Sequence, residues 1–186
     1  MILSWTLSKA LPYILWILVG LFLSWLLSRT NKKIRLIRFF IWVIPFSIYF
    51  AINPIYDGDF ANNYRTLNTS ILPEKVKAKL LVVAIPGCPY CMGSLETLKK
   101  LKTRNKNLDI QFLVCTTEKK SLSDYKLLAG NNIKVINTLK PNQWATIAEG
   151  TFPSFILVGK NTSKIWKNDG FGVRAKDEIE SIISSN

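Results

Sequence analysis

The sequence predicts an α/β protein: a mixed β-sheet with flanking helices, preceded by a two-helix transmembrane hairpin. Two observations lead to this prediction. The first third of the 186-residue chain is dominated by two apolar runs. The remainder alternates short apolar runs with segments of helical spacing and closes with a hairpin and a helix. We therefore expect residues 1–55 to form the hairpin, 56–74 a juxtamembrane linker, and 75–186 the α/β domain.

The first apolar run covers Leu11 to Leu27 and carries no charge. Extended back to Leu7 across Lys9, it is long enough to span a bilayer, so we expect a spanning helix at about 7–27. A cleaved signal peptide is the alternative. The positive region before the run is thin, however, and residues 28–31 lack the small-x-small cleavage pattern. The run is interpreted as retained.

The second apolar run covers Phe39 to Ile52. It reaches back to Ile34 if Arg35 and Arg38 extend their charged ends to the interface, which predicts a second spanning helix at about 34–52. Pro45 in its middle is tolerable, because a kink in a membrane helix can be accommodated by its neighbours. This is the weaker of the two helices.

The connection between the two runs is strongly basic, and this predicts the orientation. It holds five basic residues and no acidic one, whereas the outer flanks are poorer in basic residues. Basic connections stay in the cytoplasm, so the C-terminal domain is expected on the extracytoplasmic (periplasmic) side of a two-pass protein of the cell membrane. If the second run does not insert, the domain lies on the opposite side. The basic residues are Arg29, Lys32, Lys33, Arg35 and Arg38.

The net charge of +13 is spread along the chain. Residues 1–74 hold seven basic and three acidic residues, and residues 75–186 hold eighteen and nine, which leaves the domain at +9. The excess is mostly lysine, without the interleaved arginine and aromatic residues of a nucleic-acid surface. We expect a solvated face beside anionic membrane lipid and no nucleic-acid partner.

The linker at 56–74 is predicted from its turn-forming residues.

The strands of the domain are predicted from short apolar runs. The run Leu80–Ile85 is continuously apolar, as a strand buried on both faces would be. Ile110–Cys115 and Phe155–Val158 follow the same pattern, and a turn at 159–161 links the latter to a hairpin partner at Ile165–Lys167. A short strand is also expected at 133–136.

The helices are predicted from apolar residues at intervals of three and four. Leu95, Leu98 and Leu101 mark a helix at 91–102, and Ile179, Ile182 and Ile183 mark a closing helix at 175–184. A helix at 121–128 has Leu122, Tyr125 and Leu128 on one face, and residues 142–148 are expected to form a short helix. Because the strands and helices alternate, the sheet should be covered on both faces.

The segment Pro86–Cys91 places two cysteines between a buried strand and a helix. Cys88 would lie at or just before the first helical turn, exposed, and Cys91 one turn inward. The unpaired N–H groups and the dipole at a helix start favour a thiolate over a thiol. This arrangement indicates a dithiol that cycles between reduced and oxidised forms.

Other interpretations of the cysteines are weaker. Zinc needs four ligands, and the chain has no histidine and only one further cysteine, Cys115, so no metal is expected. A structural disulfide between Cys88 and Cys91 is possible, but so small a loop would stabilise the fold little. Cys115 ends an apolar run and is expected to be a buried, apolar-like residue.

Residues 75–186 resemble the thioredoxin-like superfamily. The resemblance rests on Cys88-Pro89-Tyr90-Cys91 at the strand-to-helix junction, on the order of elements, and on Thr151–Phe155, where this superfamily keeps a cis-proline facing the dithiol. The tetrapeptide is similar to that of glutaredoxins and of some Dsb-type oxidoreductases. Tryptophan is absent before Cys88, no acidic residue lies in 80–85, and no histidine separates the cysteines, which leaves the redox direction open.

The predicted mechanism assigns a role to each residue. Cys88 is expected to be the nucleophile and Cys91 the resolving cysteine, while Pro89 fixes the backbone. Tyr90 is expected to present a ring beside the sulfur, with a plain surface aromatic as the equal alternative. By resemblance, the backbone at Phe152, next to Pro153, would pair with an extended substrate.

These roles predict a membrane-anchored thiol–disulfide oxidoreductase without a cofactor. Its partners would be protein thiols or disulfides outside the cytoplasm and a membrane redox partner. Two alternatives stay open: a copper carrier that binds Cu(I) through both thiolates, and a non-catalytic subunit of a membrane complex.

Overall fold

The computed structural model describes residues 3–28, 35–72, 79–116 and 119–184. The chain divides into two compact units, Met1–Phe60 and Ala61–Asn186. Each unit is described by itself below.

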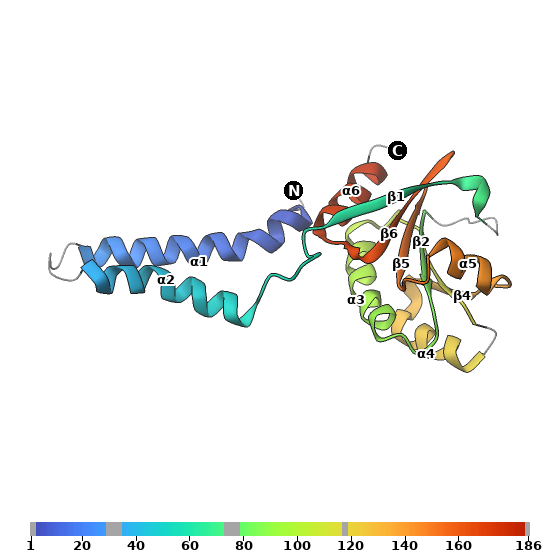
Figure 1. The fold of residues 1–186 in the computed structure, drawn as a ribbon, viewed down its shortest axis with the longest axis horizontal. Coiled ribbons are helices and arrows are strands. Elements are labelled where there is room, and N and C mark those ends of the chain that lie inside the picture. The colour runs from blue at the N-terminus through green and yellow to red at the C-terminus, as the bar shows by residue number, and fades with distance from the viewer. Residues whose placement is uncertain (1–2, 29–34, 73–78, 117–118, 185–186) are drawn as a thin grey trace. The chain divides into compact units, whose positions relative to one another are not determined.

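The first unit is a pair of helices, α1 (Trp5–Ser28) and α2 (Arg35–Ile52). They pack side by side (Figure 1): the ring of Tyr49 on α2 lies 5.1 Å from that of Tyr13 and 6.0 Å from that of Trp16 on α1. The Tyr13 hydroxyl also donates a 2.6 Å hydrogen bond to the carbonyl oxygen of Asn53. Both helices therefore form close to the predicted ranges, 7–27 and 34–52, although residue 34 lies outside the described residues.

The two helices differ in their capacity to span a bilayer. Among the described residues, α1 alone is long and apolar enough, over Trp5–Leu26, and a shorter apolar stretch is found in α2 at Val43–Ile52. A transmembrane span is thus supported for the first helix, and the second remains a prediction.

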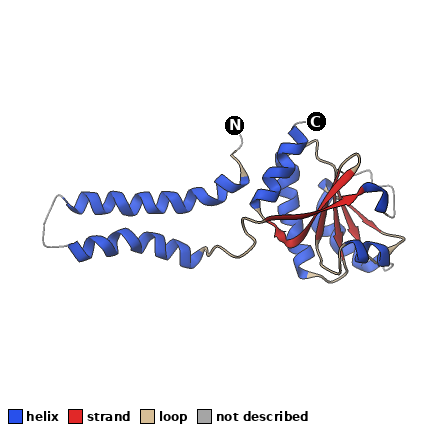
Figure 2. Ribbon diagram, turned by 45° about the horizontal axis from the view of Figure 1, so that its top comes forward, coloured by secondary structure: helices blue, strands red, loops and turns tan. Residues whose placement is uncertain are grey.

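The second unit is built on one six-stranded mixed sheet in the order β1-β6-β5-β2-β3-β4 (Figure 2). The central strand β2 is parallel to β3 and antiparallel to β5, and β3 is parallel to β4. A hairpin joins β5 to β6, and β1 lies antiparallel to β6 at the edge. The strands are β1 (Asn62–Asn68), β2 (Leu80–Ala84), β3 (Ile110–Val114), β4 (Lys134–Asn137), β5 (Ser154–Val158) and β6 (Thr162–Phe171).

Helices cover both faces of this sheet, as the sequence predicted. Figure 1 shows α3 and α6 on one side and α5 on the other. On the α5 side, Trp144 packs in a buried cluster with Leu81 and Ile156. Side chains alternate between the two faces along a strand. On the other face, the ring of Phe112 on β3 packs against that of Tyr125 on α4, with 5.2 Å between the ring centroids. The helices are α3 (Pro89–Arg104), α4 (Lys119–Ala129), α5 (Pro141–Ile147) and α6 (Val173–Ser184), with short 3₁₀ turns at Thr69–Ile71 and Gly130–Asn132.

The predicted linker at 56–74 is wrong over residues 62–68, which form strand β1. This strand pairs with β6 in a register that places Arg65 opposite Ile165 and Leu67 opposite Ser163. Its sequence was read as a connection because an edge strand exposes most of its side chains, and only Leu67 is buried. The folded unit begins at Ala61 rather than at residue 75. Residues 73 and 74 lie outside the described residues.

A polar network attaches β1 to the rest of the unit. Asn62 on β1 donates to the carboxylate of Glu178 on α6, and its side-chain oxygen accepts a 2.8 Å hydrogen bond from the indole N–H of Trp166. Lys164 on β6 forms an ion pair with the same carboxylate. One half-buried glutamate therefore joins three elements that are far apart in the chain.

Candidate active site

The site begins where the buried strand β2 turns into helix α3. All five residues of β2 are buried, and the chain then crosses an exposed turn at Pro86 and Gly87. Gly87 has φ +68°, a conformation that favours glycine. Cys88 is the N-cap of α3, and Pro89 occupies the first turn, where its missing N–H costs nothing. The helix thus starts two residues earlier than predicted, with Cys88 immediately before it.

Cys88 and Cys91 form a disulfide, with their Cα atoms 5.2 Å apart. Cys91 is fully buried, whereas Cys88 is half-buried. The Cys88 sulfur accepts a 3.1 Å hydrogen bond from the backbone N–H of Cys91. In the reduced protein the same N–H and the positive end of the helix would favour a thiolate at Cys88. One reachable sulfur and one sheltered sulfur are the arrangement that the sequence predicted.

The loop before β5 brings a distant segment to this sulfur. The Phe152–Pro153 peptide bond is cis, and the carbonyl oxygen of Phe152 lies 4.0 Å from the Cys88 sulfur. A disulfide sulfur carries no proton, so this is a van der Waals contact rather than a hydrogen bond. Pro153 is buried, and Phe152 is half-buried. The fold therefore brings together Cys88 and the Phe152–Pro153 pair, both named from the sequence.

The directions of the strands and the features at their ends identify the fold of the second unit. A buried strand leads into a helix capped by the first cysteine, that strand lies between a parallel and an antiparallel neighbour, and a cis-proline precedes the antiparallel one. The second unit has a thioredoxin-like fold. The first unit, with its apolar helix α1, is an addition to this fold.

Solved structures that are similar to this chain include the following two. One is a secreted disulfide oxidoreductase of Mycobacterium tuberculosis, described as homologous to E. coli DsbE, with 16% identity and a TM-score of 0.44 over 57% of this chain and 80% of that one. The other is a thioredoxin-like protein from Bacteroides caccae, with 12% identity and a TM-score of 0.33 over 78% of this chain and 61% of that one. No protein-family model and no curated protein matches the sequence. At these identities the likeness says nothing of this chain's reaction.

Tyr90 lies on the outside of the thioredoxin-like unit, next to Cys88. Its side chain is 71% exposed, and Pro89 is exposed beside it. An exposed aromatic ring offers apolar area to an approaching partner. That the ring of Tyr90 lies beside the Cys88 sulfur stays a prediction.

Tyr125 belongs to the site as well, although sequence reasoning placed it only on the apolar face of a helix. Its ring is fully buried, and its hydroxyl donates a 2.7 Å hydrogen bond to the carbonyl oxygen of Ile85, in the turn before Cys88. Burial raises the pKa of Tyr125, and a hydrogen bond from the backbone of Cys88 opposes that rise. A tyrosine on an apolar helix face signals that its hydroxyl needs a buried partner, but not which partner.

Cys115 differs from its prediction as a buried residue. It follows β3 directly, is half-buried, and packs against the cluster under α5. Its backbone N–H donates a 2.7 Å hydrogen bond to the carbonyl oxygen of Ala84, at the end of β2. The side chain is partly uncovered because the strand has already ended at Val114. The disulfide forms without it.

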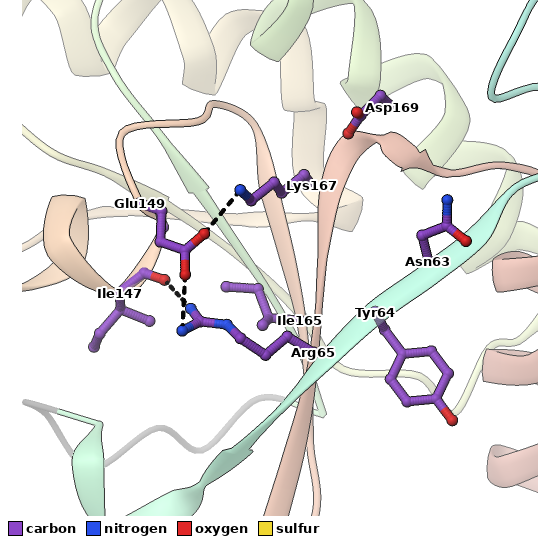
Figure 3. A pocket seen from close by; sticks show the side chains of 9 residues that line it. Asn63, Tyr64, Arg65, Ile147, Glu149, Ile165, Lys167 and Asp169 are labelled. Atoms are coloured by element: carbon purple, nitrogen blue, oxygen red, sulfur yellow. Dashed lines mark hydrogen bonds and ion pairs between the residues drawn. The ribbon is translucent and has the colours of Figure 1, made fainter.

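A hollow of about 260 Å³ lies elsewhere on the unit, between β1, β6 and the end of α5. Figure 3 shows Glu149 between Arg65 and Lys167, at 2.9 Å and 2.8 Å. Arg65 also donates a 2.9 Å hydrogen bond to the carbonyl oxygen of Ile147. None of the residues predicted for the active site lines this hollow. Its charges are largely satisfied by each other, and we assign it a structural role at the edge of the sheet.

Proposed function

We propose that this protein is a thiol–disulfide oxidoreductase whose reactive group is the Cys88–Cys91 pair. The observation that carries the proposal is the position of the Cys88 sulfur. It caps a helix, is half-exposed, and lies 4.0 Å from the backbone of Phe152, while its partner sulfur is buried. A structural disulfide has no need of an exposed sulfur beside a peptide-binding backbone, whereas an exchanging dithiol needs both.

The reaction follows from these positions. The Cys88 thiolate attacks one sulfur of a substrate disulfide, a Cys88–substrate bond forms, and the substrate's other sulfur leaves as a thiolate that takes up a proton. Cys91 then loses its proton and attacks the Cys88 sulfur, which releases the second substrate thiol. The substrate gains two electrons and two protons, and the protein is left as the disulfide seen in the structure. The reverse sequence oxidises a dithiol.

The substrate is proposed to be a protein segment in an extended conformation. The backbone of Phe152 is beside the Cys88 sulfur, so a segment that pairs with this backbone would place its own sulfur against Cys88. Tyr90 would contribute apolar contact area at the rim. Main-chain pairing of this kind accepts many sequences, which suits a catalyst that acts on several proteins.

The test uses the full-length protein in detergent, with insulin and dithiothreitol as substrates. Cys88→Ser should abolish catalysed reduction of insulin, because the attacking sulfur is gone. Cys115→Ser is the matched control and should keep the wild-type rate, since Cys115 lies outside the disulfide. Full activity in Cys88→Ser would refute the proposal.

The setting is proposed to be a membrane with the thioredoxin-like unit outside the cytoplasm. The helix α1 supports an anchor: Leu18 and Phe22 are 53% and 59% exposed although they are apolar, and the one charge in its first half, Lys9, is paired with Asp59 at 2.7 Å. If α2 spans as well, the basic connection stays in the cytoplasm and both termini lie outside. The partners there would be protein thiols or disulfides and a membrane redox protein.

Sidedness can be tested by labelling intact cells with a membrane-impermeant thiol reagent. Ser4→Cys and Ser181→Cys, each in a background without the native cysteines, should both be labelled before lysis if the protein crosses twice. Labelling of Ser4→Cys alone would mean that α2 does not cross and that the domain is cytoplasmic.

A further inference from the structure

A buried tyrosine hydroxyl lies at the turn that carries the reactive cysteine. Tyr125, on α4, donates a 2.7 Å hydrogen bond to the carbonyl oxygen of Ile85, the first residue after β2. The hydroxyl of a buried side chain therefore anchors the first residue of the turn from Ile85 to Cys88.

This connection matters because the turn is exposed. Pro86 and Gly87 are on the surface, and Gly87 has φ +68°. Tyr125 itself is held in place: its ring is fully buried and packs on Phe112 at 5.2 Å. Because the ring is fixed in the core, its hydroxyl holds the carbonyl oxygen of Ile85, and with it the start of the turn, in one position.

The effect of the connection differs between the two redox forms. In the oxidised form, a covalent bond to Cys91 fixes the position of the Cys88 sulfur. In the dithiol form that bond is absent, and the sulfur keeps its place only through the hydrogen bond from the Cys91 N–H and through the backbone of the turn. A side chain that holds this backbone therefore contributes more to the reduced form than to the oxidised one.

We propose that Tyr125 is a positioning residue that stabilises the reduced form of the Cys88–Cys91 pair by holding the turn from Ile85 to Cys88 in its N-cap geometry. The inference deepens the proposed exchange function and rests on it for its biological meaning. The hydroxyl takes no proton and forms no bond to substrate. It acts through the carbonyl of Ile85 and the backbone of the turn that ends at Cys88.

The experiment measures the equilibrium of full-length protein in detergent with glutathione buffers, read by alkylation of free thiols and mass spectrometry. Two glutathione thiols give two electrons and two protons to the protein disulfide and become one glutathione disulfide. Tyr125→Phe should lower the equilibrium constant for dithiol formation at least threefold and at most about tenfold, which is what one net hydrogen bond would contribute if it acted in the reduced form alone. A tenfold change corresponds to about 30 mV towards a more reducing potential.

Two control variants separate the hydroxyl from packing. Tyr56→Phe removes a tyrosine hydroxyl that is 68% exposed outside the thioredoxin-like unit and should leave the constant unchanged. Phe112→Leu loosens the packing around Tyr125 but keeps its hydroxyl. Thermal stability should therefore fall, while the equilibrium constant for dithiol formation stays within threefold of wild type. A change below threefold in Tyr125→Phe, a change in the opposite direction, or an equal change in Phe112→Leu would overturn the inference.

The measurement needs no protein substrate, so it can fail independently of the proposed function. If wild type does not reduce insulin but Tyr125→Phe shifts the glutathione equilibrium, the function is refuted and the role of Tyr125 stands. If wild type reduces insulin and the equilibrium does not shift, the function stands and the role of Tyr125 is refuted.

Discussion

The sulfur of Cys88 and the carbonyl oxygen of Phe152 lie 4.0 Å apart, although 64 positions separate the two residues in the chain. The strand order produces this contact, because β5 is the direct antiparallel neighbour of β2 and its first residues lie beside the last residues of β2. A partner that reaches the sulfur must therefore also meet the backbone of Phe152. In the proposed function, the attacking sulfur and the backbone that would pair with a substrate therefore lie at one place on the unit.

Cys91→Ser should trap mixed disulfides between Cys88 and protein partners. The variant can still attack, but no second thiolate is present to release the bound partner. We expect adducts on non-reducing gels of cell extracts that disappear on reduction. The double variant Cys88→Ser with Cys91→Ser is the control and should form none. Adducts that persist in the double variant would assign the attack to Cys115.

Glycine is expected to be required at position 87 but not at position 93. A Cβ would meet nothing within 4 Å at either position, but Gly87 has φ +68° whereas Gly93 lies within α3. Gly87→Ala should therefore lower the free energy of unfolding by about 1 kcal/mol through backbone strain alone. Gly93→Ala should raise it by about 0.5–1 kcal/mol, because alanine is the better helix former. Chemical denaturation of full-length protein, followed by tryptophan fluorescence, measures both, and equal effects would contradict this view of the turn.

Glu178 should make stability depend on acid pH. Burial acts to raise the pKa of its carboxyl, but hydrogen bonds from Lys164 and Asn62 outweigh burial and leave the pKa below the ordinary 4.5. A lowered pKa stabilises the folded state above pH 4.5, and this contribution is lost as the pH falls through the folded-state value. Glu178→Gln should cost about 2 kcal/mol at pH 7, because hydrogen bonds to a charged group are lost, and distinctly less near pH 3.

The matched control for Glu178→Gln is Glu96→Gln. Glu96 pairs with Lys100 on the surface of α3, with its side chain 75% exposed, and we expect no measurable change at either pH. Denaturation at pH 7 and near pH 3 compares the two variants. A loss in Glu178→Gln that is the same at both pH values would show that the carboxylate charge plays no part.

A charge in the middle of α1 should release the protein from the membrane. Leu18→Arg puts a cation among exposed apolar residues, and an arginine at the centre of a spanning helix costs about 3 kcal/mol of insertion free energy. We expect part of the protein to become extractable by alkaline carbonate, while Leu18→Ala stays with the membrane. If Leu18→Arg remains fully in the membrane pellet, α1 is not the main anchor.

Much of the site could be predicted from short stretches of sequence. The four residues from Cys88 to Cys91 carry their own geometry, since a cysteine before a helix start and a second one three positions later lie on one turn whatever surrounds them. The continuous apolar run of β2 and the leucines of α3 at intervals of three mark these two elements locally. These patterns predicted the mixed sheet, its covering helices and the reactive pair.

Contacts between distant segments were decided by the tertiary structure alone. The strand β1 has a polar, mostly exposed sequence, and only its pairing with β6 and the hydrogen bond from Asn62 to Glu178 make it a strand. The Tyr125 hydroxyl lies within hydrogen-bond distance of Ile85 because α4 packs over Phe112. The apolar repeat of α4 marks its buried face but does not encode which residue lies opposite that face. Periodicity reports which side of an element is buried, but the partner across the interface is chosen by how all the elements pack together.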